Sequence, residues 1–263
     1  MTERIKGSPV AFSVILTFVL TTFWVGTTFF ARGLSEQLGS QMSLLLSSAI
    51  NILFAAFAIT LFGKVNQING FKHIFKVKGL VKGLLVLIPV MAFFIFNMAF
   101  NASRVASADV ETAWIFPAIA FMQTTSAFLA NVLFRGLLIT ALFIKLSGTE
   151  KERVRSVFKA SVLYLLIYIP LNIVNGNHIE PMQLINTFVV GAGFCAAYMY
   201  SRNLLSLVLI QGVWQISGAV IALFAVDVYS QFSPLVLIPL IIILISIVIF
   251  AVRFSKRAEP FLI

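Results

Sequence analysis

Long apolar segments separated by short polar ones extend along almost the whole chain. Segments of about 18 to 25 predominantly apolar residues can cross the hydrocarbon core of a bilayer as α-helices. We identify eight, at residues 9–31, 42–63, 80–100, 114–144, 157–174, 182–200, 203–226 and 231–252. The fourth is longer than a span requires, which favours a tilted helix or an interfacial start. The pattern predicts an all-α, multi-pass membrane protein with a single transmembrane domain over residues 1–263.

The composition supports the same fold class. Hydrophobic residues make up 60% of the chain and charged residues 11%, and the mean hydropathy is +1.03. A soluble domain of this composition would lack the polar side chains needed to cover its surface. Cys195 is the single cysteine, which excludes an intrachain disulfide and any metal site built from several cysteines. We expect it to be a small packing residue.

The net charge of +10 is distributed unevenly between the two ends of the predicted helices. With the N-terminus inside, almost all lysines and arginines fall on one side, and only Arg32 and Arg104 fall on the other. This is the positive-inside pattern and predicts that both termini are cytoplasmic. The excess charge would then meet anionic lipids at the cytoplasmic face rather than nucleic acid. The basic segment 63–79 is either a short amphipathic piece on that leaflet or a loop that fixes orientation.

Three of the predicted helices carry polar side chains near a common depth. These are Asn131 and Arg135, then Tyr164, Tyr168 and Asn172, and finally Gln211 and Gln215. At 1.5 Å per residue, Arg135, Tyr168 and Gln211 all lie about 14 to 15 Å from the cytoplasmic end. Polar residues at such depth usually face the interior of a helix bundle and mark a site. The alternative is that they only form hydrogen bonds between neighbouring helices, with Arg135 as a structural pin.

Aromatic residues near these positions have two interpretations. Trp214 lies between the two glutamines in sequence and either walls a cavity or packs in the core. Asn172 is a candidate contact for a ligand or partner at the same site. Trp24 falls near the predicted outer interface, where tryptophan side chains form an aromatic belt.

The run ANVLFRGLL resembles the first motif of the CPBP family, which comprises the CAAX proteases and bacteriocin-processing (Abi) enzymes. That motif has two adjacent glutamates, three further residues and an arginine, usually within FRG. Phe134, Arg135 and Gly136 match it, whereas Ala130 and Asn131 occupy the two glutamate positions. The family consists of intramembrane proteases with eight spans, so the resemblance implies the same helix bundle here.

The second and third family motifs also align with this chain. A phenylalanine followed four residues later by histidine corresponds to Tyr164 and Tyr168. A histidine followed four residues later by asparagine or aspartate corresponds to Gln211 and Gln215. The resemblance covers about residues 110–218.

The four positions that would carry the protease chemistry hold no group that titrates near neutral pH. In the family, glutamate activates water, and the histidines with the second glutamate hold that water or a metal; such work needs carboxylate and imidazole. The nine acidic residues of this chain lie in loops or at the ends of spans. His73 and His178 lie in loops predicted on opposite faces of the membrane. We therefore expect no proteolysis, no cofactor and no bound metal.

The resemblance without the chemistry predicts a pseudoprotease. We expect a scaffold or regulator in the bacterial cytoplasmic membrane that binds an integral-membrane or membrane-anchored protein. The resemblance implies a role in the control of a cell-wall hydrolase or in bacteriocin immunity. One alternative is an atypical intramembrane peptidase. Another is a protein that binds or transports a lipid or peptide through the same cavity.

Overall fold

A computed structural model describes residues 9–34, 39–66, 72, 75–100, 110–139, 149–174, 181–224 and 234–255. Within these ranges the chain forms helices and no strand, which confirms the predicted all-α fold. The α-helices are α2 (Pro9–Gly33), α4 (Ser40–Asn66), α6 (Leu80–Phe100), α8 (Val110–Ala130), α10 (Glu150–Val174), α11 (Pro181–Ser201), α12 (Leu204–Phe224) and α13 (Pro234–Phe254). A π-helix, η1 (Asn131–Ile139), follows α8 directly.

Several of these helices have the length and composition of membrane spans. Four stretches of the described residues qualify fully, at Gln41–Leu61, Ile115–Gly136, Gln183–Ser201 and Leu237–Phe254. Shorter apolar stretches, at Val14–Phe30, Leu80–Phe96 and Leu204–Ala219, fall within three more of the predicted spans. The chain is thus a multi-pass membrane protein by its helices, while the count of eight spans and the cytoplasmic termini stay predictions.

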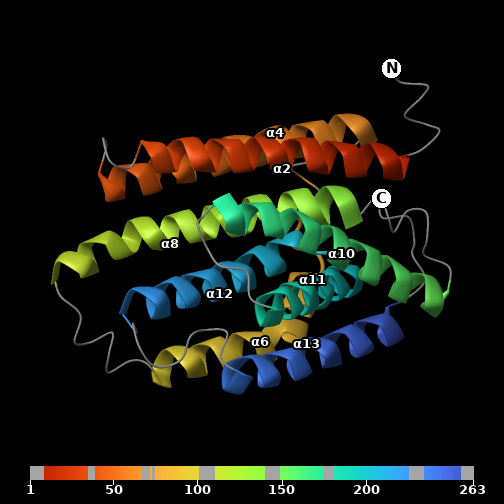
Figure 1. Cartoon of the computed structure of the whole chain (residues 1–263). Coiled ribbons are helices and arrows are strands. Elements are labelled where there is room, and N and C mark those ends of the chain that lie inside the picture. Colours follow the sequence, from red (N-terminus) through yellow and green to blue (C-terminus); the bar gives the residue numbers. More distant parts are fainter. Residues whose placement is uncertain are drawn as a thin grey trace.

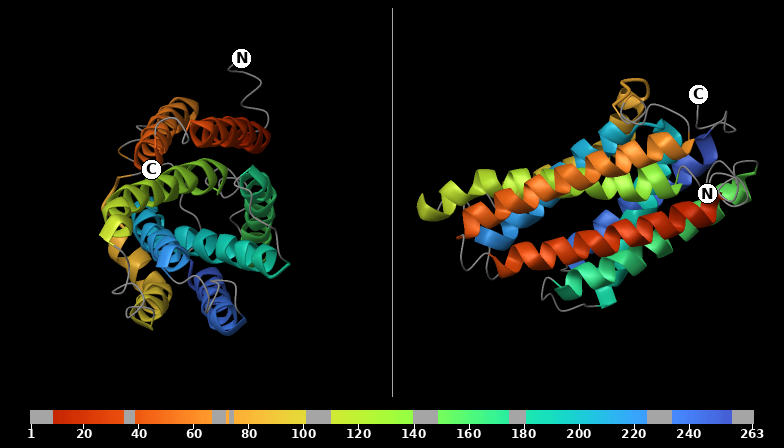
Figure 2. Two further views of the ribbon diagram at one scale, coloured as in Figure 1. Left: turned by 60° about the vertical axis from the view of Figure 1, so that its left-hand side comes forward. Right: turned by 90° about the horizontal axis from the view of Figure 1, so that it is seen from above.

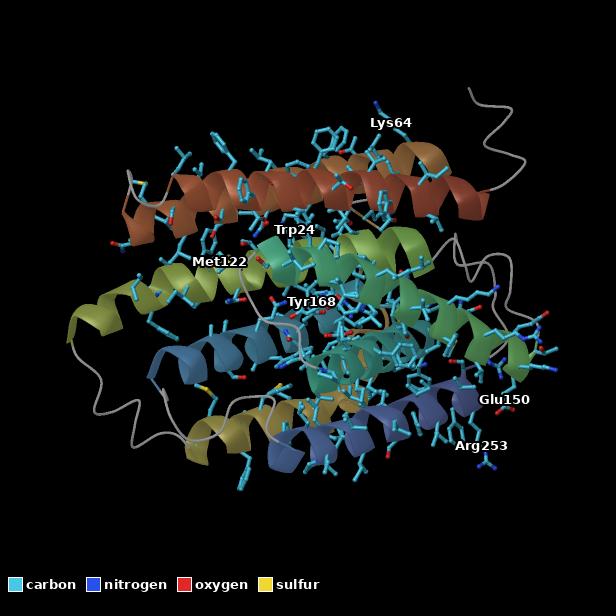
Figure 3. The ribbon with its side chains drawn as sticks, in the orientation of Figure 1. Trp24, Lys64, Met122, Glu150, Tyr168 and Arg253 are labelled. Carbon is cyan, nitrogen blue, oxygen red and sulfur yellow. The ribbon has the colours of Figure 1, made fainter. Side chains whose placement is uncertain are left out.

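The helices pack as a layered bundle with η1 near its centre. Helices α2 and α4 form a pair that covers α8 and η1 (Figure 1). On the side of α8 away from this pair, α12 packs between α8 and α6 (Figure 2). Helix α11 packs between α10 and α13. The segment η1 contacts α2, α4, α8, α10, α11 and α12, and its residues 131–136 are all buried. Glu150, at the start of α10, and Arg253, at the end of α13, lie at the same end of the bundle (Figure 3).

The fourth predicted span is not one continuous α-helix. It changes from α-helix to π-helix at Asn131, within the sequence run that carries the first motif. A π-helix bonds each N–H to the carbonyl five residues back, is rare, and is frequent at functional sites. Residues 140–144 of that predicted span lie outside the described residues.

The prediction that Trp24 is an interfacial belt residue is wrong. Its side chain is only 9% exposed, and its Nε1 donates a hydrogen bond of 2.9 Å to Oδ1 of Asn51 on α4. Asn51 Nδ2 in turn donates to the hydroxyls of Ser126 (2.9 Å) and Thr125 (3.4 Å) on α8. An indole needs a partner when it is buried, and the asparagine supplies one. This network joins α2, α4 and α8 through amide and hydroxyl groups, as is common between membrane helices.

A second polar contact fixes the turn between α11 and α12 to the chain before α6. Asn203 caps α12 by accepting a hydrogen bond from the Ser206 N–H at 2.8 Å, and its Nδ2 donates to the carbonyl of Lys76 at 2.6 Å. Burial lowers the pKa of the Lys76 ammonium group, and the positive charges of Arg202 and Lys78 lower it further. Most of the segment 67–74 lies outside the described residues, so its amphipathic character stays a prediction.

Candidate functional site

Arg135 lies on η1 and is fully buried, with 0% of its side chain exposed. Its Nη1 donates one hydrogen bond to Oδ1 of Asn131 and another to Oε1 of Gln211, each 2.7 Å long. Asn131 Nδ2 also donates to the same Gln211 oxygen at 3.1 Å. The structure therefore brings together three of the predicted site residues, Asn131, Arg135 and Gln211, which we call the amide–guanidinium triad.

Asn131, the first residue of the π-helix, bonds to the backbone as well as to Arg135 and Gln211. Its Nδ2 donates to the carbonyl of Ala127, one turn earlier, at 2.7 Å. That carbonyl lies close to the point where the backbone hydrogen bonds change from the α-helical to the π-helical pattern. The Asn131 amide therefore supplies a side-chain donor where the backbone hydrogen-bond pattern changes. Ala130, which precedes Asn131, is buried and carries no polar group.

Aromatic rings enclose the guanidinium group from two directions. Its Cζ lies 5.5 Å from the centre of the Tyr164 ring and 5.0 Å from the centre of the Phe194 ring. Phe134 packs edge-on against Tyr164 at 5.0 Å, which holds that ring in place. A cation near an aromatic face is stabilised by about 2 kcal/mol or more when the pair is removed from water.

The ring contacts continue beyond Arg135 in both directions. Tyr168 stacks on Tyr164 at 6.0 Å, and Trp214 stacks on Phe194 at 5.9 Å. Trp214 also stacks on a phenylalanine of α6 at 5.4 Å. The resulting series, which we call the aromatic column, comprises Tyr168, Tyr164, Phe194, Trp214 and Phe94. It connects α10, α11, α12 and α6 through the cation on η1; Tyr168 is labelled in Figure 3.

These contacts are of the magnitude needed to hold a buried cation. Removing a charge from water costs several kcal/mol even after the protein relaxes. A hydrogen bond to a charged group contributes about 1.5 to 3 kcal/mol, and two are present. Together with the two cation–π contacts they can offset the cost without a carboxylate. Among the acidic side chains that the structure describes, Glu150 and Glu152 lie in the first turn of α10, away from η1.

The remaining predicted residues occupy different environments. Gln215 lies one turn beyond Gln211 on α12 and is half-buried. The Oε1 atom of Gln215 and the Nε2 atom of Gln211 are both shielded and have no hydrogen-bond partner within the described residues. Trp214 belongs to the aromatic column and therefore packs against rings. Asn172 lies on α10, but its side chain is outside the described residues.

Two residues of the aromatic column, Phe194 and Phe94, are not predicted by the sequence analysis. Cys195 was considered as a packing residue, and the structure confirms that it is buried, but the adjacent Phe194 contacts the guanidinium group. A usable signal was present: a mid-membrane arginine without an acidic residue at its depth requires either amide oxygens or aromatic faces.

The described residues contain no cluster of three or more His, Cys, Asp or Glu side chains that could hold a metal ion. The groups of the triad donate and accept hydrogen bonds but do not exchange protons near neutral pH. The triad can therefore bind and orient a polar group, but it contains no carboxylate or imidazole group.

Comparison with known proteins supports the resemblance seen in the motifs. Residues 112–217 match the family model described as type II CAAX prenyl endopeptidase Rce1-like. The match covers less than half of the chain and contains all of α12 up to Ser217, η1, and most of α8. Neither a search of curated proteins nor a search of solved structures found a match. The family match thus supports a relationship to the CPBP proteases in the region that holds the triad.

Proposed function

We propose that this protein is a non-catalytic relative of the intramembrane CAAX proteases and that its helix bundle binds a membrane-anchored partner protein. The observation that carries the proposal is the amide–guanidinium triad. At the positions that align with the glutamate and histidine of the family motifs, Asn131 and Gln211 form hydrogen bonds with Arg135. The site keeps the position of the protease centre but lacks its proton carriers.

The two shielded glutamine atoms support a binding role. Gln211 Nε2 is a donor and Gln215 Oε1 is an acceptor, one helical turn apart on α12. In a membrane interior each unsatisfied polar group costs several kcal/mol. A partner helix that displaced the side chains covering these atoms and presented both an acceptor and a donor, such as an amide side chain, would satisfy both of them. From the family resemblance, the partner we expect is a bacterial envelope protein involved in cell-wall hydrolysis or bacteriocin immunity.

Site-specific photo-crosslinking in the native host tests this role. A photoreactive phenylalanine analogue at Gln215 is expected to crosslink one defined membrane protein. The matched control places the analogue at Leu209, which is on the same helix and 48% exposed. If both positions capture the same set of proteins, or Gln215 captures none, the partner-binding proposal is wrong.

A second measurement separates the proposal from an atypical peptidase. The purified protein is incubated with a prenylated CAAX peptide and its metal content is determined. We expect neither turnover nor bound metal. Cleavage that disappears in Gln211→Ala would establish the peptidase instead. If a co-purified lipid or peptide is released by Arg135→Leu, the site serves a small ligand rather than a partner protein.

A further inference from the structure

The N-terminal part of α10 carries a groove that is separate from the triad. It has a volume of about 360 Å³ and is lined by Val154, Arg155, Phe158 and Lys159. These positions follow i, i+1, i+4 and i+5 spacing and therefore share one side of the helix. All four side chains are exposed, with Val154 at 49% and Phe158 at 58%.

The groove combines an apolar pair with a basic pair. Val154 and Phe158 are one turn apart, and so are Arg155 and Lys159. Like charges at i and i+4 destabilise a helix by a few tenths of a kcal/mol, and an anion placed between them removes that repulsion. The acidic groups near this surface are in the first turn of α10. Glu152 there is engaged in a capping box with Thr149, with N···O distances of 2.9 Å and 3.3 Å.

The apolar side of the groove continues toward the membrane interior. Leu166 and Ile173, further along α10, are 57% and 61% exposed and lie on the same broad side of the helix as Phe158. Phe158 is fixed from behind by an edge-on contact with Phe188 of α11 at 5.5 Å. An acyl chain can therefore extend from the groove along α10 in contact with apolar side chains.

We propose that Val154, Arg155, Phe158 and Lys159 form a binding site for an anionic phospholipid of the leaflet predicted to be cytoplasmic. The phosphate lies between Arg155 and Lys159, and the acyl chain follows Phe158 toward Leu166. Long basic side chains at the end of a membrane helix extend their charged groups to the headgroup level while their stems stay in apolar contact. This inference does not depend on the proposed function, because none of its residues belongs to the triad or the aromatic column.

Native mass spectrometry of the full-length protein tests the site. The protein is titrated with phosphatidylglycerol or with phosphatidylcholine, and the fraction that retains one lipid is measured. For R155Q/K159Q we expect phosphatidylglycerol affinity to fall about 30-fold, since each cation near an anionic headgroup contributes about 1 kcal/mol. Phosphatidylcholine retention is expected to stay unchanged.

The matched control is K64Q/R253Q, which removes two exposed cations at other positions. It should retain phosphatidylglycerol as the wild type does, and an equal loss in both double variants would overturn the proposal. Phe158→Ala should weaken binding of both lipids, and soluble glycerol phosphate should not displace the bound lipid. Displacement by glycerol phosphate would mean that the groove binds a free phosphate and would also overturn the proposal. All substituted cations are exposed, so we expect both double variants to fold as the wild type does. An unchanged helical circular dichroism spectrum checks this.

Discussion

The Nη1 atom of Arg135 donates a hydrogen bond of 2.7 Å to Oε1 of Gln211, although the two residues are 76 positions apart in the chain. The same oxygen accepts the hydrogen bond from Asn131 Nδ2. One amide oxygen on α12 thus accepts hydrogen bonds from two side chains of η1 and joins the two helical segments.

Replacement of Gln211 is therefore expected to destabilise the bundle. In Gln211→Ala, Arg135 Nη1 and Asn131 Nδ2 both lose an acceptor, and we expect a loss of about 1.5 to 3 kcal/mol because one of these donors is charged. The free energy of unfolding in a bilayer or bicelle, measured by steric trapping, gives this value directly. Gln215→Ala is the control on the same helix and should cost less than half as much. An equal loss in both variants would show that the triad contributes no special stability.

The aromatic contacts of Arg135 predict a difference between losing a ring and losing a hydroxyl. Tyr164→Leu removes one of the two faces next to the guanidinium group and should cost about 2 kcal/mol beyond the change in packing. Phe194→Leu should behave in the same way. Tyr164→Phe keeps the ring and should lose clearly less. The prediction fails if Phe and Leu at position 164 give the same thermal midpoint in detergent.

The bond between Trp24 and Asn51 predicts energetic coupling between α2 and α4. A double-mutant cycle with Trp24→Phe and Asn51→Ala isolates the pair. We expect a coupling between about 0.6 and 1.7 kcal/mol, which are the average and the maximum found for polar pairs between membrane helices. Trp24→Phe alone keeps an aromatic side chain, although a smaller one, and removes the indole N–H donor. Additive effects of the two substitutions would contradict a direct bond.

The lowered pKa of Lys76 predicts a pH dependence of stability. The folded protein releases this proton at lower pH than the unfolded chain, whose lysine pKa is near 10.5. Between the two pKa values the unfolded state binds more protons, so stability rises with pH in that window and the penalty for burying the charge is gone above it. Below the folded pKa the full penalty applies.

Lys76→Met removes this contribution. The variant should have the higher thermal midpoint, because it carries no buried charge. Its advantage over the wild type should be largest near pH 7 and should shrink as the pH approaches 10.5. Lys82→Met, at an exposed position, serves as the control for the loss of a surface charge. A difference that is constant across this range would show that Lys76 is not responsible.

Part of the triad was predictable from the sequence, because depth along a membrane helix follows from the rise per residue. A rise of 1.5 Å per residue placed Arg135 and Gln211 at one level, and membrane helices bring residues of equal depth within reach. The arithmetic does not specify which way each side chain points. For this reason it gave Tyr168 the depth of Arg135, whereas the tyrosine ring that contacts the guanidinium group is that of Tyr164.

Two features were not predictable from such a pattern. The π-helix that begins at Asn131 contacts six other helices, and no pattern within NVLFRGLLI predicts it. Tryptophan is a residue type typical of interfacial anchors, but the indole N–H of Trp24 donates to Asn51, a residue 27 positions away. Both features involve contacts between distant segments, and the periodicity of a single segment does not report such contacts.

The shared oxygen of Gln211 also limits which single substitutions the site can accept. A neutral histidine at this position offers one acceptor nitrogen at most, so it could not serve Arg135 and Asn131 together. A glutamate at position 131 would supply Arg135 with a carboxylate but would remove the amide that bonds to the Ala127 carbonyl. A glutamate–histidine pair at these two positions would therefore need compensating changes in both η1 and α12 to restore the lost hydrogen bonds.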